Sequence, residues 1–358
     1  MGARTPGLVC AHHHLYSSLA RGMPAPAHAP SSFPVMLRDV WWRLDAALDL
    51  DILYWSAALG ATEALLAGTT CIIDHHESPN AIEGSLDVIV RACSDVGVRV
   101  IPCYGATDRW ADDGSLRLVV DPASPMTDGA RRGLDECNRF LQAGGRGMVG
   151  LHAAFTCSDD TLSRAAAIAD RHGVGVHVHV AEAIDDAAAA RRLVPFANDA
   201  WLLVHAVHLD VPLRGRIAHN PRSNMNNAVG YADPLRFTNP IMLGTDGIGA
   251  DMLEEARLAF SRLREAHPNS GADIVQKWLE AAYDIFPEAR ADVVTWSYDD
   301  VDEPWHAMYT TGIRAESVVV DGREVVRDGA PTLVDLAEVR AKAREAASTL
   351  HRRMARAA

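Results

Sequence analysis

The sequence predicts an α/β fold, a (β/α)8 TIM barrel accompanied by a small and incomplete β-sandwich unit. Eight short apolar runs recur along the chain, and amphipathic, alanine-rich stretches separate most of them. Each run is continuously apolar rather than alternating, which is typical of strands that are buried on both faces. Eight such strands with helices between them are the pattern of a closed parallel barrel.

The predicted strands follow one another from the N-terminus into the second half of the chain. They are Gly7–Ala11, Thr69–Asp74, Arg99–Tyr104, Met148–Leu151, Gly175–Val180, Trp201–Val204, Arg216–Ala218 and Ile241–Gly244. Among the intervening segments, Leu48–Leu66, Ser85–Val96 and Ser158–His172 carry the clearest helical patterns. The last of these begins at a serine suited to capping and ends before Gly173, which supports its assignment as a helix.

The C-terminal part of the chain has a different pattern. Ala291–Tyr298 predicts a strand, Ser317–Arg327 predicts a hairpin that turns at Asp321-Gly322, and a helix is expected from Leu336 to about Met354. Three strands do not bury a core alone, and the barrel is predicted to begin almost at Met1, so we expect the partner strands to be absent on the N-terminal side. We therefore expect a barrel over residues 6–285, sandwich strands over 286–335 and a closing helix over 336–358.

Two connections between predicted strands are unusually short. Only Leu209–Gly215 separates the sixth and seventh strands, and the proline-containing Tyr231–Pro240 precedes the eighth. Parallel neighbours need a crossover of about a dozen residues or more. The sequence therefore predicts that residues are missing near 212–214 and 237–239, either through deletions or because mobile helices are left out of the sequence.

Composition excludes several classes of partner. The net charge is −13 and lysine occurs only at Lys277 and Lys342, which argues against nucleic acid or an anionic membrane as partner. No apolar run approaches the roughly 18 residues that cross a bilayer, and no signal-peptide pattern opens the chain. The six cysteines include no C-x-x-C pair, so we expect free thiols and a cytoplasmic protein.

Histidines end the first predicted strand. Alternate strand residues point the same way, so His12 and His14 share one side while His13 faces the other. Two imidazoles at the C-terminal mouth of a barrel strand form half of a metal site. A remnant of an affinity tag is the alternative, but such tags do not lie inside an apolar strand.

The fifth and sixth strands add further candidates. His177 and His179 share a face, and Glu182 follows at the strand end, where a carboxyl group suits acid–base work. We interpret His179 as the ligand and His177 as a core residue. His205 ends the sixth strand and is the functional candidate there, whereas His208 is expected to be structural.

Asp246 ends the eighth strand between glycines. A carboxylate at this position is costly to bury unless it is paired or bound to metal, and a helix N-cap is the alternative role. The four strand ends together predict a metal centre. No lysine occurs before Lys277, so none of the predicted barrel strands has a lysine that could bridge two metal ions. A lysine-bridged pair is therefore excluded, and a single ion is favoured. Trp41 and Trp42 could cover a planar substrate, although packing against a helix is the commoner role of such a pair.

Several motifs resemble a known family. The segments 6–14, 177–182, 204–209, 219–224 and 243–247 resemble the amidohydrolase superfamily, and within it the mononuclear branch of chlorohydrolases and aminohydrolases. The segments 74–82, 223–230 and 246–252 are similar to the SsnA-type aminohydrolases linked with selenium metabolism operons.

The resemblance implies roles for individual residues. It implies metal ligation by His12, His14, His179 and Asp246. As a carboxylate ligand, Asp246 is also expected to accept the proton of the attacking water. Glu182 would transfer protons, and His205 would orient the attacking water or the polarised substrate. His152 matches a position that lines the substrate pocket, and Asn220 and Asn224 follow the seventh strand and are expected to shape the same mouth. Trp42 is expected to contact the substrate on the separate ground of the aromatic pair.

The expected activity is hydrolysis of a non-peptide C–N bond, with deamination of a heterocyclic or amidine-like small molecule as the leading reaction. Dechlorination or cyclic-amide hydrolysis at the same site is the alternative, and a non-catalytic barrel is a further one. We expect one divalent metal ion, zinc with iron as the alternative. A homo-oligomer is expected, while its order and the substrate stay open.

Overall fold

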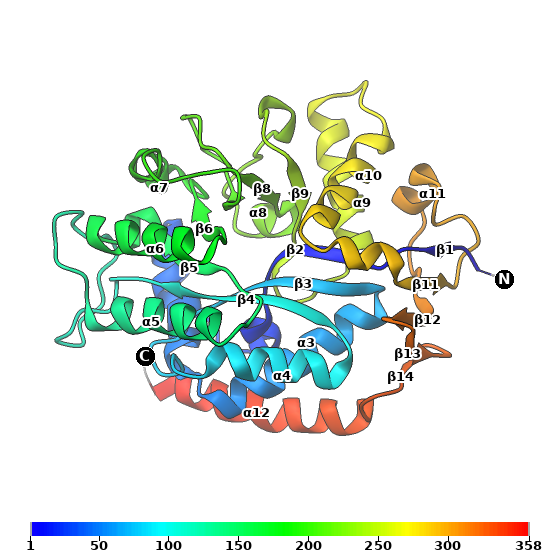
Figure 1. The fold of residues 1–358 in the computed structure, drawn as a ribbon, viewed down its shortest axis with the longest axis horizontal. Coiled ribbons are helices and arrows are strands. Elements are labelled where there is room, and N and C mark those ends of the chain that lie inside the picture. Colours follow the sequence, from blue (N-terminus) through cyan, green and yellow to red (C-terminus); the bar gives the residue numbers. More distant parts are fainter. Residues whose placement is uncertain (1, 357–358) are drawn as a thin grey trace.

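The computed structural model of the chain describes residues 2–356 and has a parallel barrel beside a small antiparallel sheet (Figure 1). All eight predicted barrel strands are confirmed. They are β2 (Leu8–His14), β3 (Thr69–His76), β4 (Arg99–Ala106), β5 (Val149–Ala153), β6 (Val176–Val180), β7 (Leu202–His205), β8 (Arg216–His219) and β9 (Ile241–Leu243). Neighbouring strands pair in parallel and in chain order from β2 to β9.

The barrel closes through a ninth, very short strand. After β9 the chain passes Gly244 and Thr245 and forms β10 (Asp246–Gly247), which pairs in parallel with β2. The Thr245 amide also donates to the His12 carbonyl oxygen at 3.0 Å. A side chain at Gly244 would collide with His12 and Asn220, so glycine permits this close approach. The pairing places Asp246 beside the histidines that end β2.

Helices cover most of the outer surface of the barrel. The longer ones are α3 (Leu50–Leu66), α4 (Ser85–Val96), α5 (Asp128–Gln142), α6 (Asp159–His172), α9 (Met252–Ala266) and α10 (Ala272–Ala281). Shorter ones are α1 (Phe33–Met36), α2 (Trp42–Ala47), α7 (Ile184–Ala187), α8 (Pro221–Asn226) and α11 (Pro304–Tyr309). The three helices expected from the sequence are among them, and Ser158 caps α6 through the Thr161 amide.

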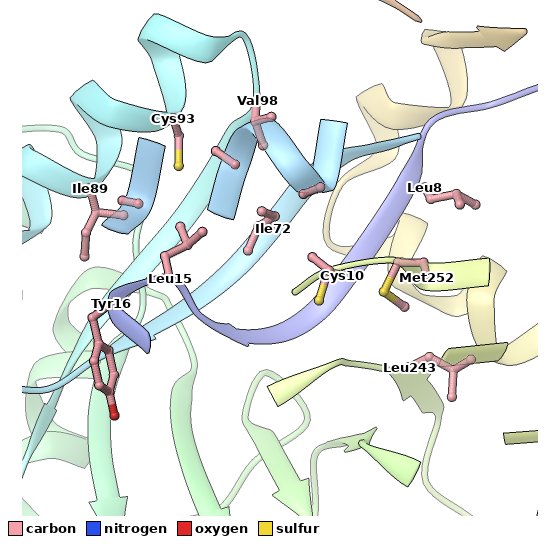
Figure 2. Packing of buried hydrophobic residues seen from close by; sticks show 14 of the residues in the cluster. Leu8, Cys10, Leu15, Tyr16, Ile72, Ile89, Cys93, Val98, Leu243 and Met252 are labelled. Carbon is pink, nitrogen blue, oxygen red and sulfur yellow. The ribbon is translucent and has the colours of Figure 1, made fainter. Parts of the chain in front are cut away.

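Two apolar layers stabilise the barrel. Between strands and helices, side chains such as Leu15, Ile72 and Ile89 pack in one continuous cluster (Figure 2). A second cluster fills the barrel interior, where Ile73 and Met242 pack against Phe286. All six cysteines are buried and free, which confirms the prediction of free thiols. Among residues 2–356, no helix combines the length and apolar character needed to cross a bilayer.

The C-terminal strands form a five-stranded antiparallel sheet. Its order is β1 (Arg4–Thr5), β11 (Val293–Trp296), β12 (Ala315–Val320), β13 (Arg323–Arg327) and β14 (Ala330–Pro331). The predicted hairpin is confirmed, since Asp321 and Gly322 both have positive φ angles at its turn. The expectation that partner strands are absent is wrong in part, because β1 and β14 supply short edges. The helix α12 (Leu336–Arg356) then packs against α3 and α2.

The two short connections close without a long helix. Residues 206–215 join β7 to β8 with no helix, and only α8 and a turn of 3-10 helix at Pro234–Arg236 lie between β8 and β9. The chain nevertheless continues through Leu213 and Arg214, and both strand pairs remain parallel. The barrel therefore closes with the residues present.

No helix lies in the connection between β7 and β8, and side chains of the connection between β8 and β9 stabilise it instead. Within the β7–β8 connection itself, the side chains of Leu209 and Leu213 are buried and add apolar contacts. In a helix, backbone carbonyl oxygens accept hydrogen bonds from backbone amides, whereas in this connection they accept them from side chains. The donors are the Arg236 guanidinium, to Leu209 (2.7 Å), Ala206 (2.9 Å) and Val207 (3.1 Å), and the Asn239 amide, to Leu213 (2.9 Å) and Gly215 (2.8 Å).

Arg236→Gln is expected to lower the free energy of unfolding by about 2 kcal/mol, because carbonyls that share one charged donor lose it together. Urea denaturation measures this change. Arg214→Gln is the matched control, since Arg214 lies in the neighbouring connection and pairs only with exposed Asp199. It should cost less than about 0.5 kcal/mol. Equal losses in the two variants would contradict the role of Arg236.

Candidate metal centre and active site

Donor groups from several strand ends meet at the C-terminal mouth of the barrel. One donor atom each of His12, His179, His205 and Asp246 lies within 4.8 Å of the others. His14 joins them, since its Nε2 lies 3.0 Å from Asp246 Oδ1 and 3.2 Å from His179 Nε2. The structure thus brings together the four residues predicted as ligands and places His205 beside them.

The outer ring nitrogens of three histidines contact oxygen acceptors. A carbonyl oxygen only accepts, so in each neutral imidazole Nδ1 carries the proton and Nε2 keeps a free lone pair. The Nδ1 bonds run from His14 to the His75 carbonyl (2.6 Å), from His179 to the His152 carbonyl (2.7 Å) and from His205 to Asn224 Oδ1 (2.8 Å). In their neutral form, these three rings would present their Nε2 lone pairs to the shared centre.

His12 is oriented by another histidine. Its Nδ1 lies 2.8 Å from His177 Nε2, and His177 Nδ1 lies 3.5 Å from Cys103 Sγ. His177 is fully buried, in agreement with its interpretation as a core residue, but it also fixes the ring of His12. The two-residue spacing to His179 was the sequence signal for this role, because it places both side chains on the inner face of β6.

Two of the proposed histidine ligands are held neutral, whereas a third shares a proton with Asp246 that a bound metal ion would replace. Burial lowers the pKa of His12 well below its usual range and that of His179 to about 3, so both rings stay neutral. Burial opposes ionisation of Asp246, but hydrogen bonds from His12 and His14 hold its pKa well below the usual range. Burial also opposes the charging of His14, whereas its hydrogen bond to Asp246 prevails and raises its pKa to about 9.

These residues fit a divalent metal ion. The buried Nε2 of His205 has no hydrogen-bond partner among the described residues, although it faces this cluster. Neutral imidazoles with one carboxylate are the donor set that zinc and iron accept in catalytic sites. Metal-binding histidines usually donate a hydrogen bond from the ring nitrogen that faces away from the metal, and the Nδ1 hydrogen bonds described above are of this kind.

Glu182 follows β6 and lies beside the cluster of donor groups. Its Oε2 is 3.5 Å from His205 Nε2, and its Oε1 accepts from the Asn227 amide at 3.3 Å. Burial raises the pKa of Glu182 to about 7. A carboxyl group with this pKa both accepts and donates protons near neutral pH, as a general acid–base requires.

The backbone at the strand ends is strained. His205 (φ 70°), Asp246 (φ 58°) and Ala181 (φ 47°) all adopt left-handed conformations that non-glycine residues rarely occupy. Each costs on the order of 1 kcal/mol or more and persists only where the surrounding structure imposes it. Two of the three are donor residues and the third precedes Glu182, so the strain is concentrated where side chains are aimed at the centre.

A cavity opens above the donor cluster. His14, His179, His205, Asp246 and Glu182 line its floor, and Phe33, Trp41, Trp42 and Phe155 supply aromatic walls. Of the residues predicted to bind substrate, Trp42 and His152 line this cavity. Asn220 and Asn224 contact the His205 ring instead, with Asn220 Nδ2 at 3.4 Å from His205 Nδ1.

A buried ionic cluster adjoins the same cavity and was not predicted from the sequence. Arg109 is fully buried, forms ion pairs with Asp45 (2.6 Å) and Glu77, and lies over the Trp42 ring at 4.7 Å. Burial raises the pKa of Glu77 to about 8 and that of Asp45 to about 6. A single arginine thus faces two carboxyl groups.

Comparison with known proteins gives consistent matches. The family described as "Amidohydrolase family" matches residues 4–282. A 5'-deoxyadenosine deaminase of Methanopyrus kandleri is 31% identical over 281 residues, which cover 71% of this chain and 60% of that protein. An 8-oxoguanine deaminase of Pseudomonas aeruginosa is 29% identical, covering 96% of this chain and 87% of that protein.

Solved structures give the same fold. The crystal structure of atrazine chlorohydrolase TrzN from Arthrobacter aurescens TC1 complexed with zinc superimposes with a TM-score of 0.79 at 22% identity, covering 96% of this chain and 88% of that one. The alignment with the 8-oxoguanine deaminase extends over 398 residues, more than the 358 of this chain. That relative therefore has residues that this chain lacks, in agreement with the short connections.

Proposed function

The chain belongs to the amidohydrolase family, and from this premise we propose that it is a metal-dependent hydrolase that deaminates a heterocyclic or amidine-like small molecule. The observation that carries the proposal is the convergence of histidine Nε2 lone pairs and the Asp246 carboxylate beside Glu182. Two relatives named as deaminases support the C–N bond as the one that is cleaved.

His12, His14, His179 and Asp246 would hold one divalent ion, with zinc favoured over iron. When bound, such an ion supplies Lewis acidity and makes water acidic enough to attack near neutral pH. His205 lies against this group and could approach the ion as well, since its Nε2 belongs to the same cluster of donors.

The chain's own residues move the protons. Asp246 accepts the proton of the attacking water, and Ser223 stabilises the carboxylate by donating to its Oδ2. Glu182 delivers a proton to the ring or amidine nitrogen. His205, with Nε2 between Glu182 (3.5 Å) and Asp246 (3.8 Å), orients the attacking water. A C–O bond forms and the C–N bond breaks. One water proton ends on the ring nitrogen and the other on the amine, which leaves as ammonia.

The test combines metal analysis with product analysis. The purified protein should contain about one zinc or iron ion per chain and release ammonia from a member of a panel of purines, pyrimidines, pterins and guanidines. Chloride release from chlorinated heterocycles, or ring opening of cyclic amides, would favour the alternative reactions at this site. Metal-loaded protein without any product would support a non-catalytic barrel.

Glu182→Gln is expected to lower turnover by a factor of about 10² to 10⁴, because the amide neither accepts nor delivers the proton. Metal content should stay unchanged, since Glu182 is not among the proposed ligands. The exposed Glu254 offers the matched control, and Glu254→Gln should retain normal turnover. Normal turnover in Glu182→Gln would exclude its role in proton transfer.

We also propose that the protein is a cytoplasmic homo-oligomer. Six free thiols support a reducing compartment. On α11 the rings of Trp305 and Tyr309 stack on each other while their side chains stay exposed, which suits a contact with a second copy. Light scattering after size-exclusion chromatography measures the oligomeric state.

A further inference from the structure

The cavity above the metal-binding cluster is strongly acidic. Within residues 2–356, five carboxyl groups line the cavity and one arginine does. The carboxyl groups are those of Asp45, Glu77, Glu182, Asp186 and Asp246, and the arginine is Arg222. The Arg222 guanidinium is already engaged, because it donates to the carbonyls of Thr245 (2.6 Å) and Gly247 (2.9 Å) and pairs with Glu255. The proposed reaction uses Glu182 and Asp246, so three carboxyl groups remain without a role.

Asp186 is the clearest of the three. It lies in α7 and is 3% exposed, and within residues 2–356 neither of its carboxyl oxygens has a side-chain partner or a well-formed hydrogen bond. The backbone amides of Ala181 and Glu182 lie close enough only to lower its pKa in part. Leaving a buried carboxylate unpaired costs several kcal/mol. Burial accordingly raises the pKa of Asp186 to about 7. A positively charged group in the cavity would supply the missing partner.

Asp45 and Glu77 add to this acidity. They share the single guanidinium of Arg109, so one negative charge is left over when both are ionised. Asp45 Oδ1 is buried and has no well-formed hydrogen bond within the described part of the chain, although the Tyr16 hydroxyl lies near this carboxyl group. The same region carries Trp42, whose ring faces the His152 ring at 6.1 Å. Aromatic faces next to carboxylates attract flat cations.

We infer that the substrate is a planar cation of the amidinium, guanidinium or protonated aminoheterocycle class, and that Asp186 accepts its N–H groups. The inference rests on the proposed function and adds the charge of the substrate to it. Aromatic walls stack on the flat molecule while the carboxylates accept its N–H donors. Phosphorylated or carboxylated substrates are disfavoured, because the single arginine that lines the cavity among the described residues is already paired.

Three isosteric probes test the charge preference: benzamidinium, neutral benzamide and anionic benzoate. Isothermal titration calorimetry on the metal-loaded protein measures each affinity without requiring turnover. Benzamidinium is expected to bind at least about tenfold more tightly than benzamide, with benzoate weakest. Equal affinities, a preference for benzoate, or no binding of benzamidinium at millimolar concentration would overturn the inference.

The variant Asp186→Asn tests whether Asp186 is the residue that accepts the N–H groups of the cation. It should weaken benzamidinium binding about tenfold and leave benzamide binding within about twofold. Asp185→Asn is the control, because Asp185 is exposed on the same helix and loses the same charge. Thermal unfolding verifies that both variants fold. An equal loss in both variants would overturn the assignment to Asp186.

The two proposals fail separately. Charge-selective binding without ammonia release from any substrate would contradict the proposed function alone. Ammonia release from neutral substrates, with no preference among the three probes, would contradict the inference alone.

Discussion

Asp246→Asn is expected to lower turnover by a factor of about 10³ or more while the protein stays folded. Asp246 is the one carboxylate among the four proposed ligands, and it contacts both His12 and His14. Asparagine has the same shape but removes the negative charge and the ability to accept a proton. It also turns an N–H donor or a weaker oxygen toward the histidines.

Steady-state kinetics with an ammonia assay measure the loss, and metal analysis separates weakened binding from lost proton transfer. Circular dichroism should show an intact fold, because the backbone bonds of β10 do not involve the side chain. Asp210→Asn is the control, since that aspartate is exposed and pairs only with Arg191. A near-normal rate in Asp246→Asn would rule out its role as ligand and base.

Arg109→Met is expected to lower the free energy of unfolding by about 3–5 kcal/mol, the usual cost of removing one partner from a buried ionic cluster. Methionine fills much of the same space but leaves Asp45 and Glu77 buried without a counter-charge. Adding Asp45→Asn to this variant should recover part of the loss, because it removes one of the unpaired charges. Chemical denaturation measures both variants.

Arg131→Met is the matched control, because Arg131 also pairs with two carboxylates, Asp128 and Asp135. Its side chain is 48% exposed, and solvent screens both pairs. This substitution should cost less than about 1 kcal/mol. Similar small losses at Arg109 and Arg131 would show that burial does not amplify the interaction.

The barrel and the donor residues were predictable because both depend on local patterns. A strand buried on both faces is continuously apolar, and the polar residue that ends it must lie at the mouth. His12, His14, His179 and Asp246 all follow this rule. The closing strand β10 was not predicted, because two residues after Gly244 carry no pattern.

Contacts between distant segments were beyond prediction. Arg109 lies in a polar loop without periodicity, and its partner Asp45 is 64 residues away in the sequence. Asn224 was expected in the pocket, yet the turn of α8 directs its amide oxygen to His205. Likewise, β1 and β14 each have two residues, too few to show the alternation that marks a strand.

Loops rather than helices cover the barrel at β7 and β8, and this affects how easily these strands open. Helices shield the other strands from solvent, whereas β7 and β8 depend on Leu209, Leu213 and side-chain hydrogen bonds. Amide protons in these two strands are therefore expected to exchange with deuterated solvent sooner than those of β3 and β4. Because His205 ends β7, we expect fluctuations of these two strands to move one of the clustered donor groups directly. Replacing residues 209–215 with a helical crossover would slow such opening.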